Sequence, residues 1–222
     1  MATDDPTTRL AAVSTSIAHA AELAGRKPES VTLIAVSKTK PPEEILPLLD
    51  AGQRVFGENR VQEAQGKWPA LREAFPDAQV HLVGQLQSNK AEDAVALFDA
   101  IHSVDRLSLV TALGRAIDKL GKRPACFLQV NIGHEDQKGG CAIADLPGLI
   151  TAARDAGLPL AGLMAVPPVE TEAAPYFALL AKLARDHGLD GLSMGMSGDY
   201  DTAVMLGATH VRVGTALFGA RK

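Results

Sequence analysis

Two lysines follow the first strongly apolar run of the chain, in the segment VTLIAVSKTKP at residues 31–41. If this run is a buried strand, Lys38 lies at its end, where an inward-pointing ammonium group loses hydration. Lost hydration lowers the pKa of the ammonium group and makes a free amine available for Schiff-base formation with a carbonyl compound. Pro41 favours an extended backbone at Lys40, so Lys38 and Lys40 are expected to share one face of the strand. Spacing alone does not choose between the two lysines, and an ordinary solvated pair remains an alternative.

Two turns of small residues near the C-terminus are candidates for holding an anion. One is MGMSGD at 194–199, which contains Ser197 and Gly198, and the other is RVGT at 212–215, which contains Gly214 and Thr215. Small residues leave backbone N–H groups accessible, and the N-terminus of a helix favours negative charge. The two turns therefore predict a phosphate site, although each is also compatible with an ordinary turn between a strand and a helix.

Strands and helices that would bring these groups together alternate along the chain, which is typical of a parallel α/β fold. The expected strands are 31–38, 54–59, 79–84, 100–105, 125–132, 160–166, 191–196 and 210–219. The expected helices between them are 42–51, 60–75, 88–97, 106–120, 145–156, 172–187 and 199–207. An extra amphipathic N-terminal helix is expected at 7–25.

Eight units of this kind in 222 residues predict a single-domain (β/α)8 TIM barrel over residues 1–222, with a doubly wound open sheet as the alternative. In a TIM barrel the active face is formed at the carboxyl ends of the strands, and phosphate is commonly held after strands seven and eight. Strand eight pairs with strand one when the barrel closes. Lys38 would then face the predicted phosphate site across the same rim.

The composition excludes several classes of function. Lys and Arg total 22 against 26 Asp and Glu, and the net charge of −4 argues against a nucleic-acid partner or an anionic membrane surface. The acidic N-terminal segment and the absence of an apolar run of ~20 residues predict a cytoplasmic protein without a membrane span. Cys126 and Cys141 lack metal-like spacing and are expected to be reduced thiols, and no histidine has a useful ligand partner. We therefore expect no metal.

Five segments, spread over nearly the whole chain, closely resemble the YggS family, also called proline synthetase co-transcribed or pyridoxal 5′-phosphate (PLP) homeostasis proteins. The segments are LIAVSKTKP (33–41), FGENRVQEA (56–64), HLVGQLQSNK (81–90), LSMGMSGDYDTAV (192–204) and VRVGTALFG (211–219). This family is similar to the barrel domain of alanine racemase, standing alone without the C-terminal β domain of that enzyme. The resemblance implies the same barrel fold for this chain.

The resemblance also implies that PLP binds covalently to Lys38 as an internal aldimine and that Arg212 contacts the cofactor. Met196 is expected to form a wall of the pocket, although a methionine at a strand end is also compatible with plain packing. Arg212 would face either the pyridine nitrogen or the phosphate, with a surface ion pair as the remaining alternative. The implied cofactor contacts are Lys38, Asn59, Met196, Ser197, Gly198, Arg212, Gly214 and Thr215.

Three functions stay open at this point. The first is a monomeric PLP carrier that serves PLP homeostasis, with apo PLP-dependent enzymes as partners and without catalytic residues. The second is an amino-acid racemase, which needs acid or base groups on both faces of its substrate. The resemblance to alanine racemase implies that one of these groups is a tyrosine of the C-terminal domain, which this family lacks. Tyr200 is the only candidate substitute in this chain, because Tyr176 is expected on an outer helix. The third is a Schiff-base aldolase that acts on a sugar phosphate. We expect the carrier.

Overall fold

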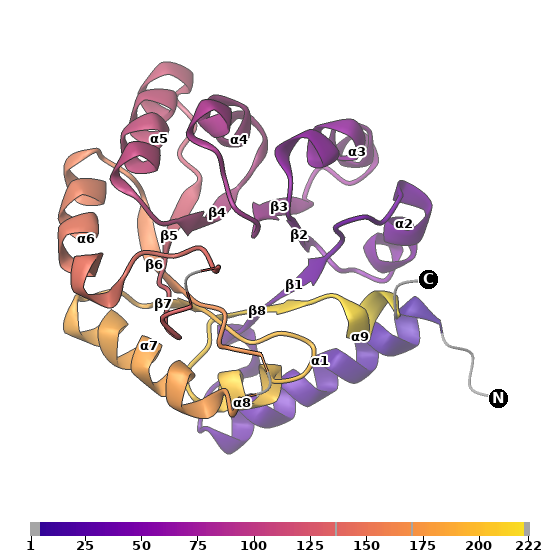
Figure 1. Ribbon diagram of the computed structural model, residues 1–222. Coiled ribbons are helices and arrows are strands. Elements are labelled where there is room, and N and C mark those ends of the chain that lie inside the picture. Colours follow the sequence, from indigo (N-terminus) through magenta and orange to yellow (C-terminus); the bar gives the residue numbers. More distant parts are fainter. Residues whose placement is uncertain (1–4, 136, 170, 220–222) are drawn as a thin grey trace.

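The computed structural model describes residues 5–135, 137–169 and 171–219. Parallel strands close into a barrel in chain order, and the last strand is hydrogen-bonded back to the first (Figure 1). The predicted (β/α)8 barrel is confirmed, and the open-sheet alternative is wrong. The strands are β1 (Thr32–Val36), β2 (Val55–Glu58), β3 (Gln79–Leu82), β4 (Ala100–Val104), β5 (Ala125–Gln129), β6 (Leu160–Met164), β7 (Gly191–Ser193) and β8 (His210–Val213).

Helices form a ring around the barrel (Figure 1). The predicted N-terminal helix is present as α1 (Pro6–Leu23), and it packs on the outside of the barrel against α2, α8 and α9. The other helices are α2 (Pro42–Asp50), α3 (Val61–Ala74), α4 (Ala91–Leu97), α5 (Leu107–Leu120), α6 (Leu146–Asp155), α7 (Ala174–Asp186), α8 (Tyr200–Met205) and α9 (Thr215–Phe218). Short 3-10 turns occur at Pro28–Ser30, Ser88–Lys90 and Ile143–Asp145.

The predicted boundaries are wrong at several strand ends. The first strand was expected to reach residue 38, but β1 ends at Val36. The last was expected to run from 210 to 219, but β8 ends at Val213 and α9 follows it. Leu217 and Phe218 are buried in this helical turn, and α9 packs against α1. The apolar run continues past the strand because its last residues pack under a helix instead of pairing in the sheet.

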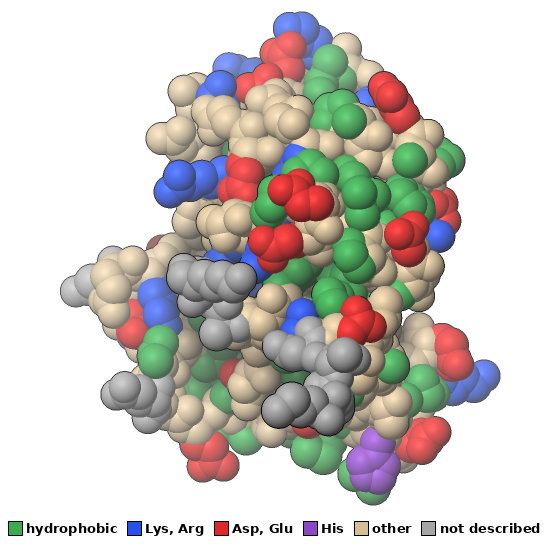
Figure 2. All heavy atoms as spheres, turned by 90° about the vertical axis from the view of Figure 1, so that its right-hand side faces the viewer, with side chains coloured by type: hydrophobic (Ala, Val, Ile, Leu, Met, Phe, Trp, Pro, Cys, Tyr) green, Lys and Arg blue, Asp and Glu red, His purple; other side chains and the backbone are tan. Residues whose placement is uncertain are grey.

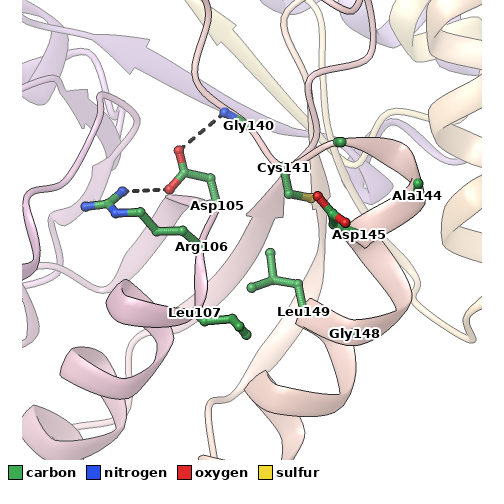
Figure 3. A pocket seen from close by; sticks show the side chains of 10 residues that line it. Asp105, Arg106, Leu107, Gly140, Cys141, Ala144, Asp145, Gly148 and Leu149 are labelled. Atoms are coloured by element: carbon green, nitrogen blue, oxygen red, sulfur yellow. Dashed lines mark hydrogen bonds and ion pairs between the residues drawn. The ribbon is translucent and has the colours of Figure 1, made fainter.

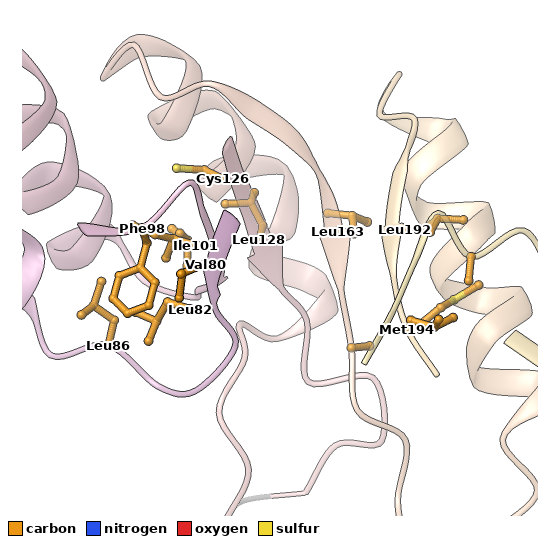
Figure 4. Packing of buried hydrophobic residues seen from close by; sticks show 14 of the residues in the cluster. Val80, Leu82, Leu86, Phe98, Ile101, Cys126, Leu128, Leu163, Leu192 and Met194 are labelled. Carbon is orange, nitrogen blue, oxygen red and sulfur yellow. The ribbon is translucent and has the colours of Figure 1, made fainter. Parts of the chain in front are cut away.

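Side chains alternate between the two sides of the barrel wall. Outward side chains such as Val80, Leu82 and Leu128 belong to the apolar cluster between the strands and the helices (Figure 4). Their inward neighbours His81 and Phe127 are equally buried but belong to the interior of the barrel. Buried polar groups therefore share an interior that branched apolar residues usually fill.

The molecular surface carries charges of both signs. Among the described residues of the face in Figure 2, Lys and Arg side chains are interspersed with Asp and Glu. Within the part of the chain that the structure describes, no helix combines the length and the apolar character needed to span a membrane.

Candidate functional site

A cavity of about 350 Å³ opens at the carboxyl ends of the strands, and it contains most of the predicted site. Gly198 is the one predicted residue outside its lining. It lines a neighbouring cavity of about 450 Å³, which shares Met196 with the first. Gly198 is exposed, whereas Ser197 before it is half-buried. The lining consists of Val36, Lys38, Asn59, Val83, Val166, Met196, Ser197, Arg212, Gly214 and Thr215.

Lys38 lies in a turn beyond the end of β1, and it is half-buried. The N–H of Lys40 donates to the carbonyl oxygen of Ser37 at 3.0 Å, and Thr39 has a positive φ of 63°. Lys40 Nζ pairs with Glu44 Oε2 at 2.7 Å instead of lining the cavity. The expectation that both lysines share one face is therefore wrong, because the strand ends before them and the turn separates their directions. Lys38 is the lysine that the cavity contains.

A buried cluster holds this turn in place. Nζ of Lys67 in α3 donates to the carbonyl oxygens of Ser37 and Lys40, at 2.9 and 3.0 Å. The same ammonium group pairs with Glu58 Oε1 at 2.9 Å and with Glu63 Oε1 at 2.9 Å. The hydroxyl of Ser37 donates to Glu58 Oε1 at 2.6 Å. The backbone on both sides of Lys38 is thus tied to α3 and to the end of β2.

Two backbone N–H groups converge on one oxygen at the rim. The N–H groups of Gly214 and Ala216 both donate to Ser197 Oγ, each at 3.3 Å. A hydroxyl and two amides at one point suit the oxygens of an anion such as phosphate.

The loop after β7 has a shape that requires glycine at one position. Gly195 has a φ of 91°, and a Cβ on it would lie 2.6 Å from the Cβ of Ala203. Asp199 Oδ1 accepts from the N–H of Met196 at 2.6 Å, which ties the loop to the start of α8. This loop positions Ser197 opposite the amides of Gly214 and Ala216.

Arg212 extends from β8 into the barrel interior, and only 5% of it is exposed. Its Nη1 donates to Ser193 Oγ at 2.7 Å, and its Nη2 donates to the carbonyl oxygen of Ala165 at 2.9 Å. Burial lowers the pKa of the guanidinium to about 10, so it stays charged at neutral pH. No described carboxylate lies within ion-pair distance of it, and the surface ion pair considered for Arg212 is wrong.

Several residues that line the cavity were not predicted from the sequence. Val36, Val83 and Val166 line the cavity, and each lies at or just after the end of a strand, which is a position that the barrel prediction could have selected. Gly84 supports Asn59, because a Cβ on it would lie 2.3 Å from the carbonyl oxygen of Asn59. No pattern in the sequence indicates that close approach.

A third, larger cavity of about 620 Å³ lies between α5 and α6 (Figure 3). Cys141 lines it beside Asp145, but burial and the nearby Asp105 raise the pKa of the thiol to about 11. Cys126 is buried elsewhere, and burial raises the pKa of its thiol to about 12. Both cysteines are free, and the described residues contain no group of three metal-ligating side chains. Lys38, Arg212 and Gly214 line the cavity of about 350 Å³ instead.

Known proteins resemble this chain over nearly its whole length. Residues 9–222 match the family described as alanine racemase, N-terminal domain. The chain is 44% identical to a pyridoxal phosphate homeostasis protein of Pseudomonas aeruginosa, over 96% of this chain and 94% of the relative. It is 41% identical to the pyridoxal phosphate homeostasis protein of Escherichia coli K12, over 96% of this chain and 95% of the relative.

A solved structure is similar in fold and sequence. PipY of Synechococcus elongatus, determined with PLP bound, superimposes with a TM-score of 0.78 at 42% identity. The match covers 91% of this chain and 100% of PipY.

Proposed function

Because the chain belongs to the alanine racemase N-terminal domain family and, within it, to the pyridoxal phosphate homeostasis proteins, we propose that it binds PLP in the cavity of Lys38. We propose further that it holds the cofactor for intracellular PLP homeostasis without turning over a substrate. The observation that carries this proposal is that Lys38 lines one cavity together with Ser197 and Gly214, where two amides converge on a hydroxyl oxygen.

Each part of the cavity fits one part of PLP. The amides of Gly214 and Ala216, with the hydroxyl of Ser197, would bind the phosphate, and Thr215 lines the same cavity. Gly198 directly follows Ser197 in the chain, and we keep it as a proposed phosphate contact. Arg212 donates to Ser193 and to Ala165 and not to Ser197, so we assign it to the pyridine ring. PLP supplies an aldehyde that reacts with a primary amine, and Lys38 supplies that amine.

The remaining lining residues would enclose the ring. Val36, Val83 and Val166 present apolar surface, and Met196, which is 38% exposed, lines the cavity as well. Asn59 contributes a polar side chain from the turn after β2. These contacts would exclude water from the amine of Lys38 and would orient the cofactor.

The carrier is favoured over the racemase by the charges around the cavity. Among the described lining residues, the ionisable side chains are Lys38 and Arg212. Tyr200 begins α8 and Tyr176 lies on α7, and neither lines the cavity. A racemase needs a second acid or base opposite the lysine. A guanidinium near the ring nitrogen can only donate a hydrogen bond, so the nitrogen stays unprotonated and the ring withdraws electrons less strongly.

Ligand binding separates the cofactor proposal from the aldolase alternative. Purified protein titrated with PLP should become yellow and should bind PLP more tightly than pyridoxal, because pyridoxal lacks the phosphate. Ser197→Ala should reduce the difference between the two ligands. A protein that stays colourless with PLP but forms a reducible adduct with a sugar phosphate would support the aldolase and contradict the proposal.

Transfer of PLP separates the carrier from the enzyme. PLP-loaded protein mixed with an apo PLP-dependent enzyme should restore the activity of that enzyme. The same loaded protein should give no racemase, lyase or aminotransferase rate in a screen of amino acids. A robust rate on any amino acid would overturn the carrier. We also propose that the protein acts as a monomer, which sedimentation of the loaded protein would test.

A further inference from the structure

A chain of buried polar side chains crosses the barrel interior from Arg212. Ser193 on β7 and His102 on β4 are fully buried, and His81 on β3 is 5% exposed. Nδ1 of His102 lies 2.8 Å from Ser193 Oγ, and its Nε2 lies 3.1 Å from Nδ1 of His81. Buried polar groups are costly unless each finds a partner, so this arrangement calls for an explanation beyond the filling of space.

The hydrogen bonds of this chain have one consistent direction. A guanidinium only donates, so Ser193 Oγ accepts from Arg212 and its own proton is directed to Nδ1 of His102. His102 therefore carries its proton on Nε2 and donates it to Nδ1 of His81. Donation runs without a break from the cation to His81, and aligned bonds of this kind strengthen one another.

This direction of donation requires that both histidines are neutral, and burial lowers the pKa of each ring enough to keep it neutral. Burial, followed by the nearby His210, lowers the pKa of His81 to about 3. Burial also lowers the pKa of His102 well below 6.5, with further contributions from His81, His210 and Arg212. At neutral pH each ring thus accepts at Nδ1, and Arg212 is the single cation of the chain.

We propose that Ser193, His102 and His81 are positioning residues that hold the Arg212 guanidinium against the PLP ring. Among the described residues, Arg212 donates to Ser193 and to the carbonyl of Ala165, which occupies two of its five N–H groups. Arg212 also lines the cavity, where its remaining donors are available to a ligand. The inference rests on the proposed binding of PLP in that cavity.

Neighbouring rings provide a control for packing alone. His102 stacks on Phe127 with ring centroids 4.3 Å apart, and His210 packs edge-on against the same phenylalanine at 5.0 Å. The His210 ring bonds to Thr209 Oγ1 at 2.9 Å, outside the chain to Arg212. His210→Phe therefore disturbs the same aromatic cluster and leaves the positioning chain intact.

The test measures PLP affinity and the absorption spectrum of bound PLP across pH, together with the melting temperature of each unliganded variant. Ser193→Ala and His102→Phe should weaken PLP binding by about tenfold and should shift the absorption band or its pH midpoint. His102→Asn keeps an acceptor near the position of Nδ1 and should restore most of the affinity. His210→Phe should bind PLP with unchanged affinity and an unchanged spectrum.

Different failures have different meanings. If the wild-type protein does not bind PLP, the proposed function itself fails. If the wild type binds PLP and Ser193→Ala binds it equally well with the same spectrum, only the positioning chain is overturned. The same conclusion follows if His210→Phe reproduces the losses of His102→Phe, because packing would then explain both. Ser193→Ala keeps the test decisive if the larger change at His102 prevents folding.

Discussion

Nζ of Lys67 lies 2.9 Å from the carbonyl oxygen of Ser37, the residue directly before Lys38. The Lys67 side chain is 7% exposed, and its ammonium group also pairs with the fully buried Glu58 at 2.9 Å. A single buried cation in α3 therefore fixes the turn that presents the proposed PLP-binding lysine. The connection is indirect, because Lys67 contacts the backbone around Lys38 and not the cavity.

Lys67→Met should lower both stability and PLP affinity. The substitution leaves the Glu58 carboxylate buried without its cation, so we expect a loss of about 3 kcal/mol in the free energy of unfolding by urea. Lys182→Met is the matched control, because Lys182 pairs with Asp186 on the surface and is 63% exposed. The control should lose no more than about 1 kcal/mol. Equal losses in the two variants would contradict the role of the cluster.

Gly84→Ala should weaken PLP binding without unfolding the protein. The new Cβ would lie 2.3 Å from the carbonyl oxygen of Asn59, so the turn that carries Asn59 must move. Gly66→Ala is the control, because Gly66 lies in α3 with open space around its Cβ position. The control should raise stability by about 0.5–1 kcal/mol and leave PLP affinity unchanged. PLP titration and thermal melting of both variants check the prediction.

Acid should destabilise the fold through the buried histidines. Burial lowers the pKa of His81 to about 3 and that of His210 to about 4, while in the unfolded chain these groups titrate near 6.5. The unfolded state therefore binds more protons below pH 6.5. The stability that depends on neutral His81 and His210 is complete above pH 6.5 and is lost as the pH falls toward 4.

The expected slope is about 1.4 kcal/mol per pH unit for each histidine that protonates only on unfolding. Urea unfolding between pH 7 and 4.5 would measure it. His210→Phe should reduce the slope, whereas His19→Asn at an exposed position should not. A flat profile in the wild type would mean that the interior accepts protons without unfolding.

Both cysteines should react slowly in the native protein. Burial raises the pKa of the Cys126 thiol to about 12 and that of Cys141 to about 11, so little thiolate is present at pH 7.5. Iodoacetamide labelling followed by mass spectrometry should modify neither residue until denaturant is added. Rapid labelling of Cys141 in the native protein would show that the cavity in Figure 3 exposes a reactive thiol.

The order of strands and helices was predictable from sequence because hydrophobic periodicity changes where strand gives way to helix. The end of β8 was not, because apolar side chains continue past the strand into α9. The end of β1 was not either, because the turn at Lys38 depends on contacts of Lys67, which lies in the distant helix α3. Gly198 lines the neighbouring cavity, and this could not be predicted, because the direction of a loop depends on contacts such as that of Asp199 with the N–H of Met196. The pairing of His102 with His81 and Ser193 depends on barrel closure between distant strands, which no local pattern encodes.

The covalent attachment of PLP to Lys38 tests the central claim most directly. Protein loaded with PLP should be reduced with borohydride, digested and mapped by mass spectrometry, with Lys38→Ala and Lys40→Ala treated in parallel. We predict that the pyridoxyl group is found on Lys38, that Lys38→Ala stays colourless, and that Lys40→Ala is labelled like the wild type. Labelling of Lys40, or full labelling elsewhere in Lys38→Ala, would contradict the account.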